Sequence, residues 1–106
     1  MLSVVVQDEE GNAVTEPFSV PTALLVNTLV RPGGSYDQSS FRCLCFVDPY
    51  GDTTFNQLQF APLLEDLCKL RKLLPSDADK TAIQQIEELI TRYQNTPGAY
   101  IKLIGD

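Results

Sequence analysis

The chain has 106 residues, of which 43% are apolar and 21% charged, and it carries a formal net charge of −6. This balance is typical of a single folded domain and excludes an intrinsically disordered chain. Its longest apolar runs fall far short of the roughly 20 residues that a membrane-spanning helix needs, so we expect no membrane span.

The first 30 residues predict a strand, a return strand and a short helix. Leu2 to Gln7 contains three consecutive valines and ends at an acidic, Gly-Asn turn. The return strand is expected at Ala13 to Val20, and it either lies at a sheet edge or carries a break, because Pro17 lacks a donor for the ladder. Pro21 to Val30 is expected to form a short helix whose apolar residues share one face, although the same residues also fit a buried strand. Residues 31 to 40 are rich in turn formers and predict a loop.

The middle of the chain predicts two further strands. Phe41 to Val47 is apolar on both faces, which is typical of a central strand covered on both sides. Thr53 to Gln59 alternates in part and predicts a shorter strand. The stretch DPYGDTTFNQ, residues 48 to 57, connects these two predicted strands and overlaps the start of the second.

The second half predicts two amphipathic helices and a last strand. The first runs from Pro62 to Leu74 and turns Glu65, Asp66, Lys69 and Lys72 toward water. Ser76 or Asp77 caps the second, which reaches Gln94. Ala99 to Ile104 alternates as a strand tied into the sheet. The chain is therefore expected to be one α+β domain over residues 1 to 106, with a mostly antiparallel sheet of four to five strands and an antiparallel helix pair packed on one face.

The negative charge is concentrated in the first half of the sequence. Residues 1 to 60 hold seven acids and two bases, a net of −5, whereas residues 61 to 106 hold seven acids and six bases, a net of −1. An acidic surface repels nucleic acid, and the bases at Lys69, Arg71, Lys72 and Lys80 are interpreted as a solvated helix face. We therefore expect neither a nucleic-acid partner nor a membrane partner.

Cysteine usage points to a reducing compartment. Cys43, Cys45 and Cys68 are odd in number, and the first two share a likely strand, so we expect reduced thiols. Three thiols without any histidine do not make a structural zinc site, and we expect no metal and no cofactor. The N-terminus lacks the basic start and cleavage pattern of a secretion signal. These features together predict a cytoplasmic protein.

The polar stretch at residues 48 to 57 has the chemistry of a tight turn. Asp48 can accept backbone N–H groups, Pro49 presets φ, and Gly51 tolerates unusual conformations. Asp52 and Thr53 can satisfy backbone donors at the strand ends, and Asn56 can bond the loop to itself. The structural interpretation is therefore that this stretch turns the chain.

Three functional interpretations of the same stretch remain open. A cation site has oxygens at Asp48, Asp52 and Asn56, but their spacing differs from that of the calcium-binding loop. A pair of carboxylates suits general acid and base catalysis, but nothing else marks a substrate pocket. An exposed Tyr50 on an acidic loop is an anchor of the kind that protein interfaces favour, and this is the preferred functional interpretation. The sequence also lacks histidine dyads, a nucleophile elbow, and phosphate-binding glycine loops.

The segment FRCLCFVDPYGDTTFNQLQ and the ending AYIKLIGD resemble a set of short uncharacterised bacterial proteins. That set shares a D-P-Y-G-D-T-x-F-N segment and a Y-[IL]-x-F-[IV]-G-D close, and the likeness covers Phe41 to Asp106. Leu103 stands where the pattern has phenylalanine, which keeps the position apolar. The resemblance implies a bacterial cytoplasmic origin and a joint role for Asp52, Asn56 and Asp106, but no activity.

The leading hypothesis is a cytoplasmic binding module without catalytic activity, whose acidic first half meets a basic or polar protein partner. Bacterial immunity proteins offer an analogy of size and charge. The alternative is an enzyme or metal-dependent ligand binder that uses Asp48, Asp52, Asn56 and Asp106. A purely structural subunit or homodimer is a third hypothesis. The candidate binding residues are Asp48, Tyr50, Asp52, Asn56 and Asp106.

Overall fold

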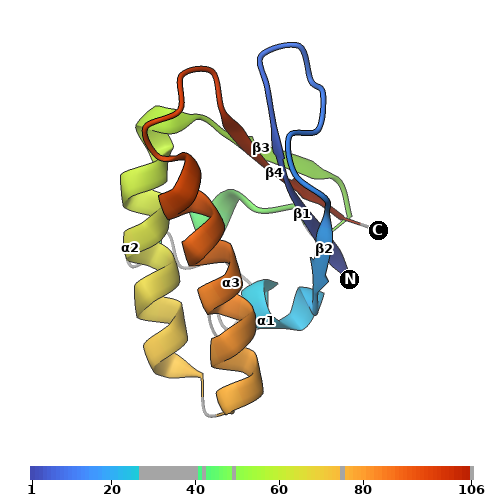
Figure 1. Ribbon diagram of the computed structural model, residues 1–106. Helices are drawn as coiled ribbons and strands as arrows, with labels where there is room; N and C mark the ends of the chain where they lie inside the picture. The colour runs from blue at the N-terminus through green and yellow to red at the C-terminus, as the bar shows by residue number, and fades with distance from the viewer. Residues whose placement is uncertain (27–40, 42, 49, 75, 106) are drawn as a thin grey trace.

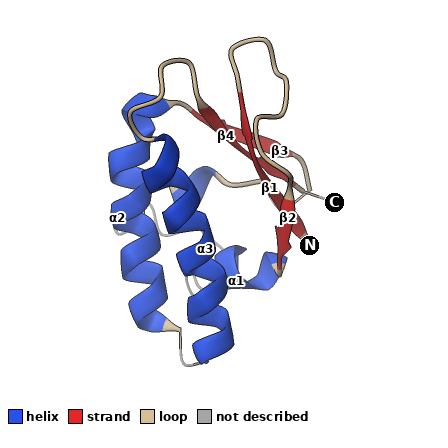
Figure 2. Cartoon of the chain, in the orientation of Figure 1, coloured by secondary structure: helices blue, strands red, loops and turns tan. Residues whose placement is uncertain are grey.

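The computed structural model describes residues 1–26, 41, 43–48, 50–74 and 76–105. In chain order the elements are β1 (Leu2–Gln7), β2 (Phe18–Val20), α1 (Thr22–Val26), the 3₁₀ turn η1 (Leu44–Phe46), β3 (Asp52–Phe55), α2 (Gln57–Leu73), α3 (Asp77–Tyr93) and β4 (Tyr100–Ile104). Four antiparallel strands form one sheet, and α2 packs against α3 beside it (Figures 1 and 2). The prediction of an α+β fold with a helix pair is confirmed.

The strand order is β2-β1-β4-β3, so the first and last strands of the chain form the centre of the sheet. Val4 lies opposite Leu103, and Val6 lies opposite Ile101. Opposed residues of an antiparallel pair share a face, and these four side chains are buried in the core. Lys102 alternates with them and belongs to the outer face. The predicted alternation of the last strand, and its place within the sheet, are thereby confirmed.

The apolar run 41 to 47 is not a central strand, contrary to the sequence prediction. Its residues from Leu44 to Phe46 form the 3₁₀ turn η1, and the backbone N–H of Val47 closes it on the carbonyl of Leu44. Phe41, Cys43, Leu44 and Val47 are nevertheless buried. A short apolar run is compatible with a buried turn as well as with a buried strand, because its pattern of apolar residues does not distinguish the two structures.

Helix α2 begins five residues earlier than predicted. Asn56 is its N-cap residue, and the side-chain oxygen of Gln59 accepts a hydrogen bond from the Asn56 backbone N–H at 3.0 Å. This contact is half of a capping box, which starts a helix efficiently. Pro62 consequently lies inside the helix, not at its start, and cannot donate to the carbonyl of Leu58. The predicted strand from Thr53 therefore ends at Phe55 instead of Gln59.

The remaining elements follow the sequence with shorter bounds. The return strand is confined to β2, directly after Pro17, and it does lie at a sheet edge as predicted. Helix α1 confirms the choice of helix over strand for residues 22 to 26, while 27 to 40 lie outside the described residues. Ser76 caps α3 through its hydroxyl, which accepts from the N–H of Asp79. Among the described helices, none has the length and apolar content to cross a membrane.

Candidate functional site

The loop of residues 48 to 52 joins η1 to β3 and is held by hydrogen bonds to its own chain. The backbone N–H of Tyr50 donates to Asp48 Oδ1 at 2.9 Å, and that of Asp48 donates to Thr53 Oγ1 at 2.9 Å. A third bond joins the Gly51 N–H to the Asp48 carbonyl. The structural interpretation of this stretch as a turn therefore agrees with its contacts, since each bond fixes the loop locally.

The loop is also tied to the end of the last strand. The N–H of Gly105 donates to the carbonyl of Gly51 at 2.8 Å, one residue beyond the pairing of Asp52 with Ile104. The two segments that carry the sequence resemblance, at residues 48 to 56 and at the C-terminal end, are thus neighbours in space. Asp106 itself lies outside the described residues.

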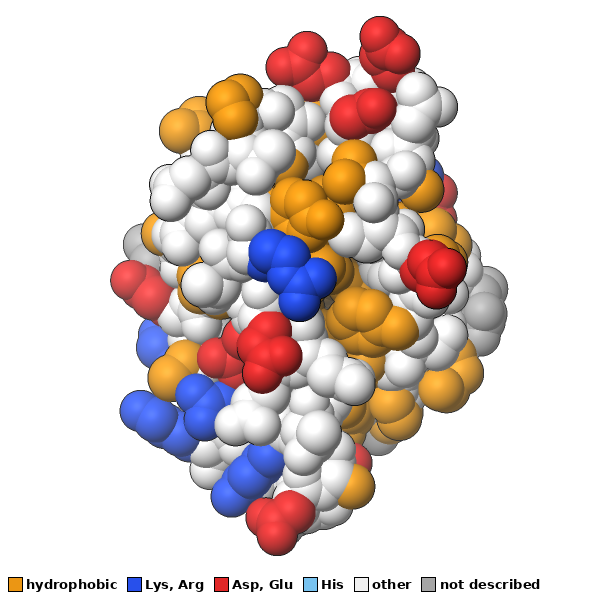
Figure 3. Space-filling model, in the orientation of Figure 1, with side chains coloured by type: hydrophobic (Ala, Val, Ile, Leu, Met, Phe, Trp, Pro, Cys, Tyr) orange, Lys and Arg blue, Asp and Glu red, His pale blue; other side chains and the backbone are white. Residues whose placement is uncertain are grey.

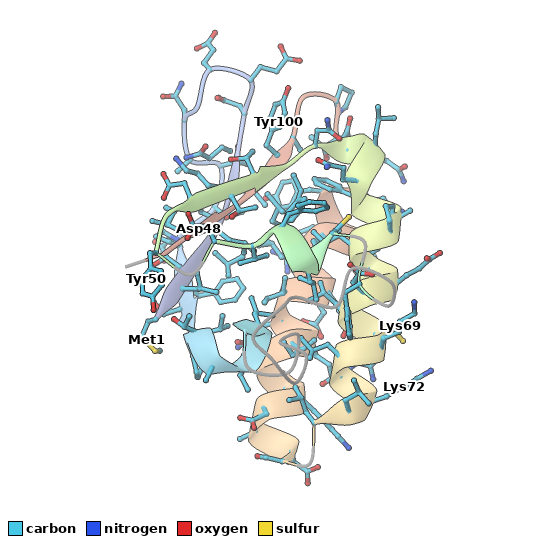
Figure 4. The ribbon with its side chains drawn as sticks, turned by 180° about the vertical axis from the view of Figure 1, so that it is seen from behind. Met1, Asp48, Tyr50, Lys69, Lys72 and Tyr100 are labelled. Atoms are coloured by element: carbon cyan, nitrogen blue, oxygen red, sulfur yellow. The ribbon has the colours of Figure 1, made fainter. Side chains whose placement is uncertain are left out.

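Tyr50 is highly exposed, with 82% of its surface accessible. Figure 4 shows Asp48 and Tyr50 at one end of the sheet, on the opposite side of the view from Lys69 and Lys72 of α2. A large aromatic side chain left in water on a loop with fixed backbone is suited to insertion into a partner surface. The loop itself is therefore preorganised for contact.

Asp52 follows Tyr50 and lies on the outer face of the sheet. Its carboxylate forms an ion pair with the ammonium of Lys102 on β4, with 3.3 Å between Oδ2 and Nζ. The side chains are 53% and 25% exposed, so water and salt screen this pair and it contributes little stability. The pair leaves the carboxylate accessible to another cation from solvent.

Asn56 lies at the other end of β3 from Asp52 and does not join the loop. Asn56 follows Asp52 by four residues along the strand direction, which corresponds to roughly 13 Å. Its role in the described structure is to cap α2. The fold thus brings Asp48, Tyr50 and Asp52 together and leaves Asn56 apart. A site that needs the carboxylates and this amide in one place does not follow from that arrangement.

The described residues offer no group of three or more His, Cys, Asp or Glu side chains placed to hold a metal ion. A hollow of about 520 Å³ lies on the helix pair, where Arg71, Glu87 and Arg92 contribute to its wall. A second, of about 350 Å³, lies between the β1–β2 connection and α3 and includes Phe18. Neither of these two hollows is lined by Asp48, Tyr50 or Asp52.

Charge divides between the two layers of the fold. Residues 57 to 93, which contain the helix pair, hold six acids and five bases. The described residues outside that range hold six acids and one base, Lys102, which gives 1 − 6 = −5. In Figure 3, Lys and Arg side chains gather over the helices, whereas acidic side chains mark the top of the molecule. Three of these six acids, Asp8, Glu9 and Glu10, follow Gln7 at one end of the sheet, whereas Asp48 and Asp52 lie at the other end.

Sequence reasoning missed the structural role of Asp66. The residue was expected to face water, but it is 1% exposed and accepts hydrogen bonds from the backbone N–H groups of Cys43 and Leu44. Its position was readable, because it lies three residues after Leu63 and four before Leu70 on the apolar face of α2. The contact of Asp52 with Lys102 was missed as well, because the strand pairing was not known.

Comparison of the chain with protein-family models, with curated proteins and with solved structures found no match. The resemblance of residues 41 to 106 to short bacterial proteins therefore stays a prediction. The function is inferred below from the contacts, exposure and charge of the loop and the strands beside it.

Proposed function

We propose that this chain is a small protein-binding module without catalytic activity, which acts in the bacterial cytoplasm and binds a basic protein. The contact surface is the loop of residues 48 to 52, which carries Asp48, Tyr50 and Asp52 at one end of the sheet. The observation that carries the proposal is Tyr50, which is 82% exposed on a loop whose backbone is fixed by four hydrogen bonds.

Two physical features support such a contact. Fixing the loop before binding lowers the conformational entropy that association must overcome. The −5 of the described sheet layer attracts a cationic surface over distances of about a Debye length, close to 8 Å at physiological salt. A toxin with a positive surface is one partner of this class, by analogy with immunity proteins.

The proposal is tested by capturing partners on the immobilised chain from an extract of the source cell, at about 0.05 M and about 0.5 M salt. We expect one or a few basic proteins, retained at low salt and released at high salt. The Tyr50→Ala variant should lose them. Leu58→Ala is the matched control, because Leu58 is 89% exposed but lies in the first turn of α2, at the far end of β3.

A photo-crosslinking residue at position 50 identifies the captured protein in the intact cell. It thereby excludes contacts that form only after the cell is broken. Capture that is unaffected by Tyr50→Ala, or that persists equally in both salt concentrations, would contradict the proposal. So would a metal ion or small molecule bound among Asp48, Asp52 and Lys102 in place of a protein.

A further inference from the structure

The sheet has two edges, and β3 forms one of them. The order β2-β1-β4-β3 leaves β3 paired with β4 on one side and with no described strand on the other. In Figure 4, which shows the molecule from behind, β3 lies in front of the other strands of the sheet. An edge of this kind carries backbone groups that can pair with a further strand.

The register identifies those groups. The carbonyl of Gly51 accepts from Gly105, and Thr53 lies opposite Leu103, so residues 51, 53 and 55 direct their backbone groups toward β4. The N–H and C=O groups of Asp52 and Thr54 consequently point away from the sheet. No hydrogen bond within the part of the chain that the structure describes reaches them, and both residues are exposed.

The opposite edge, β2, is protected in a way that β3 is not. Pro17 and Pro21 bracket its three residues, and proline cannot donate to an added strand. Strand β3 contains no proline and follows directly on the loop that carries Tyr50. The exposed side chain of Tyr50 therefore lies next to the start of the open edge, because β3 begins two residues after Tyr50.

We infer that β3 binds an extended, basic segment of the partner protein as an added strand, an inference that rests on the proposed function. The two outward N–H and two outward C=O groups offer up to four backbone hydrogen bonds. Asp48 and Asp52 attract lysine or arginine side chains of the added segment, and Tyr50 packs against its apolar ones. A second copy of this chain is the disfavoured occupant, because two molecules of charge −6 repel each other.

The test uses the full chain and a fluorescent synthetic peptide of alternating lysine and valine, about ten residues long. Thr54→Pro removes one outward N–H without touching the ladder to β4, and we expect about tenfold weaker binding. Ser19→Pro is the matched control. The pairing of Ser3 with Ile104 and of Ser19 with Ser3 directs the Ser19 backbone outward on the other edge, so its affinity should equal that of wild type.

Hydrogen exchange gives a second readout that needs no variant. Peptide binding should slow exchange of the Asp52 and Thr54 amides at least tenfold, whereas the amides of Thr53 and Phe55 are already protected by β4. This measurement tests whether the peptide pairs with the edge of β3 even if Thr54→Pro does not fold.

Several outcomes would overturn the inference: no binding of the lysine-valine peptide, equal binding by wild type and Thr54→Pro, unchanged exchange at Asp52 and Thr54, or equal binding of a helix-forming lysine-alanine peptide. A wild-type chain that sediments as a dimer, and as a monomer after Thr54→Pro, would assign the edge to a second copy instead. Binding lost by Tyr50→Ala but not by Thr54→Pro would leave the proposed function standing and remove the added strand.

Discussion

The carboxylate of Asp66, in the middle of α2, accepts a hydrogen bond from the backbone N–H of Cys43 at 2.7 Å. The same oxygen accepts the N–H of Leu44 at 3.0 Å. One buried side chain therefore holds the segment that leads into η1 against the helix pair. That segment in turn precedes the loop of residues 48 to 52, so Asp66 links the helix layer to the candidate contact surface.

We predict that Asp66→Ala lowers the free energy of unfolding by about 3 kcal/mol. Two buried N–H groups lose their acceptor, and each unsatisfied group costs about 1–3 kcal/mol. Urea unfolding followed by circular dichroism measures the change. Glu88→Ala is the control, because this acid is exposed on α3 and its loss should change stability by less than about 0.5 kcal/mol. Equal effects of the two substitutions would contradict the anchoring role.

Much of the fold was readable from the sequence because its signals are local. The valine run of β1, the alternation of β4 and the serine cap of α3 each depend on a few neighbouring residues. The run from Phe41 to Val47 failed for a physical reason. Two of its backbone donors, the N–H groups of Cys43 and Leu44, are satisfied by the side chain of Asp66, which lies 22 to 23 residues away in the sequence. No local pattern contains that contact.

The candidate site was likewise predictable only where its contacts are local in the sequence. The turn chemistry at Asp48 and Gly51 is local, and the structure places those bonds within the loop. The separation of Asn56 from Asp52 was not predictable, because it depends on where β3 ends and α2 begins. Capping by Asn56 and Gln59 decides that boundary, and the alternating pattern of residues 53 to 59 hid it.

Thr53→Val should loosen the loop of residues 48 to 52 at little cost in stability. The substitution removes the oxygen that accepts the Asp48 N–H, but this donor is exposed and can turn to water, so we expect a loss below about 1 kcal/mol. Exchange of the Asp48 amide should become faster by about tenfold. Thr54→Val is the control, because Thr54 is exposed and has no such bond. Unchanged exchange at Asp48 in Thr53→Val would show that the loop is held by other contacts.

Arg71 and Glu87 join α2 to α3, with 2.8 Å between Nε and Oε1 and 3.5 Å between the second pair of atoms. The hydrogen bond to Glu87, and then its negative charge, raise the pKa of Arg71. A raised pKa means that the contribution of Arg71 to stability is fully present below its ordinary pKa and is lost only as pH rises into strong alkali. Deprotonation of this group therefore gives no change across neutral pH.

We predict that Arg71→Gln produces a small fall in Tm at low salt, because the two side chains are only half-buried and water still screens the pair. The coupling in a double-mutant cycle with Glu87→Gln should shrink when salt is raised to about 1 M. Calorimetric scans of the four proteins at both salt concentrations measure it. A coupling that does not respond to salt would indicate packing of the side-chain stems, not an ion pair.

Gly98 provides the last prediction, because it combines a left-handed backbone with a crowded site. Its φ is +75°, and a Cβ there would lie 2.7 Å from Oε1 and 2.8 Å from Cγ of Glu9. Gly11 has a similar φ of +85° with nothing within 4 Å, so it isolates the backbone cost alone. We expect Gly11→Ala to lower the free energy of unfolding by about 1 kcal/mol, and Gly98→Ala to cost slightly more, because the exposed side chain of Glu9 must move aside.

The excess at Gly98 should disappear when Glu9 is truncated. In a Glu9→Ala background, Gly98→Ala should cost about the same as Gly11→Ala, because only the backbone penalty remains. Urea titrations of the single and double variants measure the coupling. Equal costs for the two glycines in the wild-type background would show that the β1–β2 hairpin does not press on the connection between α3 and β4.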